Sequence, residues 1–338
     1  MNRPEWFDKL KPYANHDIRR AVFYILTSFV PYLAIVAIMF LMLMRGYPYW
    51  IILVVSIFAV GFYVRTFIIF HDCSHTSFIN SKKICTILGL FCGVLTFTPF
   101  FDWQRNHGIH HATVSNLDKR GTGDVWTMTL DEYKASNFRV RLSYRLFRNP
   151  IFLFIIAPVF LFVIVYRFPQ KSTRKKDYFS IIFTDIILVF IVITMHYTVG
   201  IKNYIAVQLP VIFIATSVGV WLFYIQHQFE DVYWAHGEKW DLISAALKGA
   251  SFYNLPGALS WFTGNIGYHN LHHMNPRIPC YNLRRCYNEI SELHYKPPIT
   301  LKTGFKSLRL HLWDEETGRL ISFKDAHRKM KSVLRQIG

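Results

Sequence analysis

The chain has 338 residues, of which 52% are hydrophobic and 17% aromatic, and its formal net charge is +17. This length allows one large domain or two small ones, and so apolar a composition argues against an ordinary soluble core. The lysines and arginines cluster between and after long apolar segments, at 167–176, 284–285, 296–309 and 324–335, and no nucleic-acid motif accompanies them. The charge therefore indicates basic loops on the cytoplasmic side of a membrane and argues against nucleic acid as a partner.

Four apolar segments are long enough to cross a bilayer, which requires about 20 mostly apolar residues per helix. They are residues 21–44, 49–70, 178–200 and 204–225. The first two predict a helical hairpin. The last two predict a second hairpin around the turn Gly200-Ile201-Lys202-Asn203.

Two further apolar segments are interrupted. Residues 84–101 contain Gly89, Gly93 and Pro99, and residues 150–168 contain Pro158. A full crossing at either segment would put the histidine motifs described below on opposite sides of the membrane. We therefore predict that both segments dip into the membrane and return, or lie in its interface.

The remaining segments, 71–83, 102–149 and 226–338, are then cytosolic, and the basic cluster at 171–176 falls on the same side. The predicted fold class is an all-α integral membrane protein, with four transmembrane helices in two hairpins, two re-entrant or interfacial segments and a cytosolic helical cap. We expect a single domain over residues 1–338. The five cysteines, an odd number without metal-type CxxC spacing, are predicted to be reduced thiols.

Eight of the 15 histidines fall in three short motifs. An HxxxH motif contains His71 and His75, and two HxxHH motifs contain His107, His110 and His111, and His269, His272 and His273. At this histidine frequency one HxxHH motif is expected by chance about 0.03 times in such a chain. Residues at i, i+3 and i+4 share a helix face, so we expect each motif to offer all its imidazoles to one point.

Eight neutral imidazoles are too many for one metal ion but suit two, and two adjacent ions can share one bridging oxygen species. Imidazole suits iron, zinc, copper and nickel, so the residues alone leave the metal open. His227 follows the fourth span on the same side as the motifs and is predicted as a ninth ligand. Some of the nearby acids are expected to orient the ligands through hydrogen bonds; these acids are Asp72, Asp102, Asp118 and Asp124.

The three motifs, in this order and between paired spans, resemble those of the membrane fatty acid desaturases. Further stretches are similar to bacterial acyl-lipid desaturases, namely residues 116–124, 226–231, 261–265 and 269–283. The likeness covers nearly the whole chain and is weakest at its two ends.

This resemblance implies an enzyme with a diiron centre that uses O2 to introduce a cis double bond into an acyl chain. It implies that the eight motif histidines ligate two iron ions. Likeness to the animal acyl-CoA desaturases adds His227, but those relatives carry an Asn four residues earlier, where this chain has Phe223. The first motif differs from that of the acyl-CoA enzymes, which favours the acyl chains of membrane glycerolipids as substrate. The expected location is the cell membrane, with several crossings and the active site facing the cytoplasm.

The chain has no flavin, iron–sulfur or haem motif, so electrons must come from a separate donor. A basic surface including Arg284, Arg285 and Lys302 would suit an acidic ferredoxin, with anionic lipid headgroups as the alternative partner. Two other functions stay open at this stage. One is a hydroxylase of acyl lipids or alkanes on the same scaffold, and the other is a zinc-binding membrane transporter or receptor.

Overall fold

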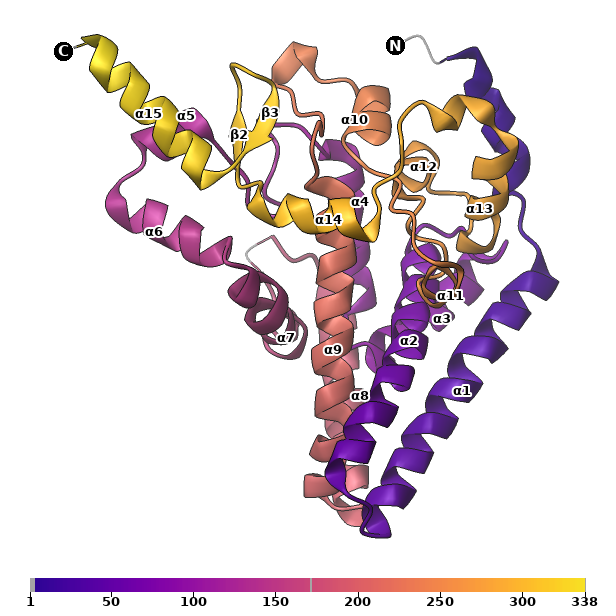
Figure 1. Ribbon diagram of the computed structural model, residues 1–338. Coiled ribbons are helices and arrows are strands. Elements are labelled where there is room, and N and C mark those ends of the chain that lie inside the picture. The colour runs from indigo at the N-terminus through magenta and orange to yellow at the C-terminus, as the bar shows by residue number, and fades with distance from the viewer. Residues whose placement is uncertain (1–3, 171, 338) are drawn as a thin grey trace.

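The computed structural model describes residues 4–170 and 172–337 as a bundle of long helices topped by a cap of short elements (Figure 1). Within these residues, four helices are long and apolar enough to cross a membrane. They are α1 (Ile18–Met44), α2 (Tyr49–Ser74), α8 (Lys175–Thr198) and α9 (Ile201–His227). Every helix end lies within four residues of the predicted end. These helices confirm the predicted all-α membrane fold. Apolar segments form helices in lipid because a helix satisfies its own backbone hydrogen bonds.

The connection between α8 and α9 is tighter than predicted. Ile201, Lys202 and Asn203, expected in the turn, already belong to α9. Gly200 has a φ of +84°, a conformation that glycine adopts without steric cost, and this lets the chain reverse over so few residues. Lys171, the first residue of the predicted basic cluster, lies outside the described residues.

Neither interrupted segment forms a straight span. Helix α3 (Lys82–Leu95) meets α4 (Phe100–Thr113) at 102°, and α6 (Phe138–Phe147) meets the segment Phe152–Arg167 at 60°. That second segment comprises η2 (Phe152–Ile156), α7 (Ala157–Val163) and η3 (Val165–Arg167). A Cβ atom on Gly93 would lie 2.4 Å from the Thr98 carbonyl oxygen, so the fold-back from α3 into α4 requires glycine there.

The cap contains short helices, as predicted, and also a small sheet that the sequence did not predict. Strand β1 (Met128–Thr129) pairs in parallel with β2 (Leu312–Asp314), which pairs antiparallel with β3 (Arg319–Ile321). The other elements of the cap are η1 (Glu5–Ala14), α5 (Leu130–Ala135), η4 (Gly237–Lys239), α10 (Leu242–Lys248), α11 (Gly257–Phe262), α12 (His269–Met274), α13 (Cys280–Glu289), η5 (Ser291–His294), α14 (Leu301–Lys306), η6 (Ser307–Arg309) and α15 (Phe323–Ile337).

A buried arginine ties this cap to the end of α9. Arg148 is 2% exposed and donates to the Leu310 carbonyl at 2.7 Å and to Gln228 Oε1 at 3.0 Å. Gln228 in turn donates to Thr127 Oγ1 at 3.1 Å. Because buried polar groups are costly unless they are paired, this network fixes the loop before β1 against α9. The five cysteines are buried and free, as predicted.

Candidate metal centre

All nine predicted ligands lie at the same end of the membrane helices. His71 sits in the last turn of α2 and His75 caps that helix, while His227 is the last residue of α9. Helix α4 carries the second motif and α12 the third. In Figure 1, α4 and α12 lie close to these ends of α2 and α9.

The nine imidazoles form two groups, and within each group the ligand nitrogens lie within 4.8 Å of one another. The first group has five members: His71, His75, His107, His111 and His272. The second group has four: His110, His227, His269 and His273. The groups adjoin each other, since the rings of His111 and His273 stack with centroids 4.1 Å apart.

Each HxxHH motif contributes to both groups, so the expectation that all three imidazoles share one point is wrong. His107 and His111 join the first group, whereas His110, which lies between them, joins the second. Each residue of a helix is rotated about 100° from the one before it. The i+3 and i+4 side chains therefore diverge enough to serve two neighbouring centres.

Short contacts between ring nitrogens characterise both groups. In the first group the Nε2 atom of His111 lies 3.1 Å from that of His107 and 3.0 Å from that of His272. In the second group the Nε2 atom of His227 lies 3.2 Å from that of His110 and 3.0 Å from that of His269. A metal–imidazole bond of about 2.1 Å puts two ligand nitrogens about 3.0 Å apart when the bonds meet at a right angle.

Hydrogen bonds on the outer side of the rings explain why these nitrogens face one another. Nδ1 of His110 is 2.7 Å from Asp124 Oδ1, and Nδ1 of His227 is 3.2 Å from the Gly249 carbonyl oxygen. These acceptors hold the ring protons on Nδ1 and leave lone pairs on Nε2. The Nε2 lone pairs of His110 and His227 therefore face each other with no proton between them. A bound cation would relieve the repulsion between these two lone pairs. His71 and His75 also have buried Nε2 atoms for which the described residues supply no hydrogen-bond partner. The donor set therefore fits one metal ion per group.

Electrostatics keep the third motif ready to coordinate. Burial lowers the pKa of His269, His272 and His273 well below the ordinary value, and the neighbouring histidines lower it further. At neutral pH these rings are uncharged and have a lone pair available, the state that metal binding requires.

Two of the four nearby acids contact a motif histidine. Asp72 Oδ1 lies 3.1 Å from His71 Nδ1, and Asp124 contacts His110 as described above. Asp102 instead accepts from Asn106 Nδ2 at 3.2 Å, and Asp118 pairs with His236 at 2.5 Å. The partner of His227, the Gly249 carbonyl, was missed because a backbone acceptor leaves no signal in the sequence.

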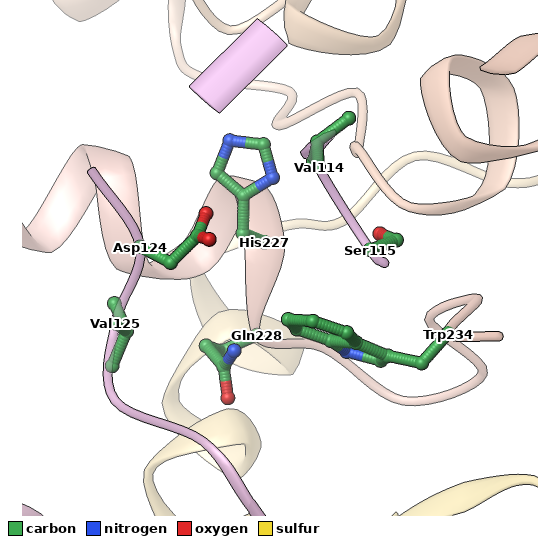
Figure 2. A pocket seen from close by; sticks show the side chains of 7 residues that line it. All are labelled: Val114, Ser115, Asp124, Val125, His227, Gln228 and Trp234. Carbon is green, nitrogen blue, oxygen red and sulfur yellow. The ribbon is translucent and has the colours of Figure 1, made fainter. Parts of the chain in front are cut away.

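A cavity of about 10 Å³ adjoins the second group (Figure 2). That volume holds about one water molecule. Its polar lining comes from Ser115, Asp124, His227, Gln228 and Trp234. The indole N–H of Trp234 is buried and has no hydrogen-bond partner in the described part of the chain. Beside the same group, the Phe223 ring lies 5.3 Å from the His110 ring and 5.1 Å from the His227 ring, so position 223 offers an apolar face and no ligand.

Comparison with known proteins identifies the family. The family model described as fatty acid desaturase matches residues 46–303, a range that includes all nine histidines. A fatty acid desaturase of Bacillus subtilis (strain 168) is 43% identical over 312 residues, which cover 92% of this chain and 88% of the relative. The chain belongs to the fatty acid desaturase family. The predicted family is confirmed, and the desaturase is an enzyme rather than a zinc-binding transporter or receptor.

More distant relatives carry more specific names. An sn-1 oleoyl-lipid 12-desaturase of Picosynechococcus sp. is 25% identical over 237 residues, covering 67% of the desaturase and 65% of the relative. An sn-1 acyl-lipid omega-3 desaturase (ferredoxin) of Synechocystis sp. is 25% identical over 241 residues, covering 67% of the desaturase and 64% of the relative.

Proposed function

We propose that this desaturase introduces a cis double bond into the acyl chains of membrane glycerolipids, with O2 as co-substrate and two iron ions as cofactor. The observation that carries the proposal is the pair of adjoining all-histidine groups at one end of the membrane helices, in which seven of the nine histidines are buried. Two iron ions held there would activate O2 and remove the hydrogens from two adjacent methylenes. The ligands in this proposal are the five histidines of the first group and the four of the second.

The protein contributes ligand geometry, exclusion of water and substrate position. His272 is fully buried and His110 is 1% exposed, whereas His75 and His111 are half-buried, so the protein restricts the access of bulk water to the proposed ions. The Trp103 ring stacks on His107 at 4.3 Å and extends the apolar surroundings. Moving an acyl chain from lipid into water costs about 0.8 kcal/mol per methylene, and a site at the end of apolar helices avoids that cost. Binding would then fix one C–C bond beside the ions and so select the carbon atoms that are oxidised.

We further propose that residues 1–338 form one domain in the cell membrane, with the histidines facing the cytoplasm. The family match extends from the start of α2 into α14, across both the membrane helices and the cap, which supports a single unit. The end of the membrane helices that carries the nine histidines is called the histidine end below. Arg19 and Arg20, in the first turn of α1, lie at this end, and so do Lys175 and Lys176, which begin α8. A basic excess on that side is typical of the cytoplasmic side of a membrane protein.

Electrons would come from an external donor such as a small acidic ferredoxin. The name of the Synechocystis relative mentions ferredoxin, which supports this choice. The exposed residues Arg284, Arg285 and Lys302 lie in the cap and supply positive charge of the kind that steers an acidic partner.

Expression in a bacterium without an acyl-lipid desaturase tests the proposal. We expect its glycerolipids to gain a chain with one cis double bond, in an O2-dependent manner, located by mass spectrometry. His110→Ala should abolish the product, because it removes a ligand of the second group. His196→Ala is the matched control: it changes an exposed histidine of α8 outside both groups and should leave the yield unchanged.

Other results would contradict the proposal. A hydroxylated chain without any alkene would identify a hydroxylase on this scaffold. Purified protein that contains zinc and lacks O2-dependent turnover would exclude the diiron assignment, whereas we expect about two iron ions per chain. Full activity of His110→Ala would refute the ligand assignment.

A further inference from the structure

A groove of about 570 Å³ opens between α11 and α13. The two helices are neighbours near the histidine end of α1 and α2 (Figure 1). The residues of its lining that matter here are Trp261 from α11 and Tyr281, Arg284, Arg285, Asn288 and Glu289 from α13. None of them belongs to either histidine group.

Both walls of the groove are attached where the chain enters the membrane helices. Arg20, in the first turn of α1, donates from Nη1 to Asn282 Oδ1 of α13 at 3.0 Å. Arg65 of α2 donates to the Trp261 carbonyl, and its guanidinium lies 4.0 Å from the centre of the Trp261 ring. Because Arg20 stands at the start of a membrane span, the groove lies at the level of the lipid headgroups. Tryptophan is enriched at this level in membrane proteins.

The groove presents a cation without a partner. Arg285 pairs with Glu289 at 2.9 Å, but Arg284 forms no ion pair or hydrogen bond within the described part of the chain. The side-chain amide of Asn288 is likewise unengaged among the described residues, and it faces the same groove. A free guanidinium beside a free amide suits a phosphate, because the planar fork of arginine donates two parallel hydrogen bonds to such an oxyanion.

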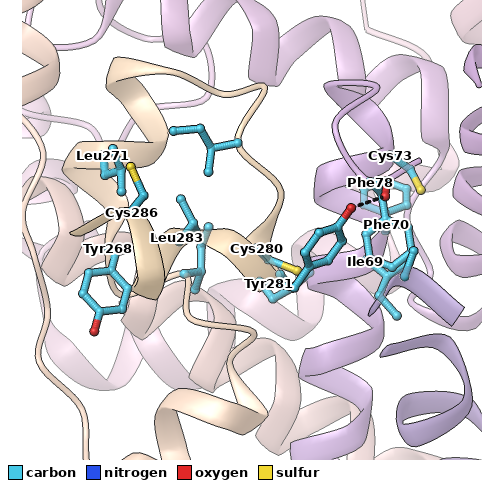
Figure 3. Close-up of a cluster of buried hydrophobic side chains, with 14 of the residues drawn as sticks. Ile69, Phe70, Cys73, Phe78, Tyr268, Leu271, Cys280, Tyr281, Leu283 and Cys286 are labelled. Atoms are coloured by element: carbon cyan, nitrogen blue, oxygen red, sulfur yellow. Dashed lines mark hydrogen bonds between the residues drawn. The ribbon is translucent and has the colours of Figure 1, made fainter. Parts of the chain in front are cut away.

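The inner wall of the groove leads to the first histidine group. Tyr281 packs in one apolar cluster with Ile69, Phe70 and Cys73 of α2, and its hydroxyl donates to the Phe78 carbonyl (Figure 3). The residue before it, Cys280, donates its N–H to Asp72 Oδ2 at 2.6 Å. Since Asp72 also contacts His71, one carboxylate separates the wall of the groove from a proposed iron ligand.

We propose that this groove binds the phosphate of a glycerophospholipid headgroup through Arg284, and so sets the position of the attached acyl chain relative to the first histidine group. The proposal rests on the proposed function and narrows its substrate class from glycerolipids to those with an anionic phosphate. A lipid is favoured over a protein donor because the groove lies at the level where α1 enters the bilayer. Arg284 and Arg285, which both line the groove, then leave the surface assigned to the electron donor, and Lys302 remains in it.

Lipid kinetics with the full-length, iron-loaded protein test this inference. Phosphatidylglycerol and a neutral diglucosyl diacylglycerol with the same acyl chains are each diluted into micelles, and alkene formation is followed against the mole fraction of lipid. We expect Arg284→Gln to raise the KM for phosphatidylglycerol about fivefold, the effect of about 1 kcal/mol from one basic residue at a membrane surface, and to leave the KM for the neutral lipid unchanged. Arg284→Lys should recover most of the loss.

Two further measurements separate lipid binding from other roles. Native mass spectrometry of the metal-free protein should count less bound phosphatidylglycerol on Arg284→Gln than on the wild type, independently of catalysis. Lys239→Gln removes an exposed positive charge that does not line the groove, and it should match the wild type in both assays.

The possible failures are distinguishable. An unchanged lipid KM in Arg284→Gln, or a rise in the electron-donor concentration needed for half-maximal rate with lipid KM unaltered, would overturn the headgroup site while leaving the desaturase proposal intact. Absence of alkene from the wild type on both lipids would instead overturn the proposed function. In that case, if native mass spectrometry showed that Arg284→Gln binds as much phosphatidylglycerol as the wild type, the proposed headgroup site would be overturned as well.

Discussion

The carboxylate of Asp72 offers a sharp test of the metal centre, because it is 1% exposed and accepts two hydrogen bonds. Oδ1 faces His71 Nδ1 at 3.1 Å, and Oδ2 accepts from the Cys280 N–H at 2.6 Å. The substitution Asp72→Asn preserves the size of the side chain but replaces one acceptor oxygen by an NH2 donor. In either orientation of the amide, its NH2 group faces one of the two buried N–H groups, that of His71 Nδ1 or that of the Cys280 backbone. That N–H group loses its acceptor.

The size of the effect follows from that single lost acceptor. A buried N–H left unpaired costs about 1–3 kcal/mol, which corresponds to about 5- to 140-fold in an equilibrium constant. If the amide keeps its bond to Cys280, the loss falls on His71, and iron affinity should drop about 10- to 100-fold. If the amide keeps its bond to His71, the loss falls on the start of α13, and the unfolding temperature should drop instead.

Iron retention against increasing chelator and the unfolding temperature, measured on the same preparation, give both quantities. Asp124→Asn is the matched control. Its Oδ1 faces His110 Nδ1 at 2.7 Å, but among the described residues its other oxygen accepts only from the exposed Gly121 N–H at 3.3 Å, where water can substitute. The loss in Asp124→Asn should therefore be smaller. An Asp72→Asn variant with wild-type iron retention and wild-type unfolding temperature would refute this reasoning.

Two further predictions concern packing and pH. Gly89→Ala places a Cβ atom 2.1 Å from the Phe100 ring, so we expect about 1–3 kcal/mol of destabilisation and a lower melting temperature. Gly219→Ala should melt like the wild type, because its added Cβ atom would meet no described atom within 4 Å apart from its chain neighbours and the nearby backbone of its own helix. Equal melting of both variants would contradict the close contact of α3 with α4. A hydrogen bond to Asp118 raises the pKa of His236, so the resulting stabilisation is present below about pH 6.5 and is lost as the pH rises through the folded-state pKa. His236→Gln should thus lower the melting temperature in mildly acidic buffer and have little effect in alkaline buffer, and a difference independent of pH would argue against that pairing.

Local chemistry is sufficient to predict the membrane helices and the motifs. A run of about 20 apolar residues must form a helix in lipid, because no water is there to satisfy its backbone, and this depends on no distant residue. The four spans were predictable for that reason. Likewise the spacing of His107, His110 and His111 indicated a helix that presents imidazoles together, before any partner element was known.

Tertiary structure decided how those imidazoles are shared. His110 and His111 are adjacent in the chain, yet they join different groups: His111 meets the histidines of α2, and His110 meets His227 at the end of α9. The roles of Asp72 and Asp124, and the pairing of β1 with β2, equally depend on contacts between segments far apart in the chain or on the path of a loop. Sequence periodicity determines which side chains leave a helix on a common side, but only the packing of helices determines what they meet.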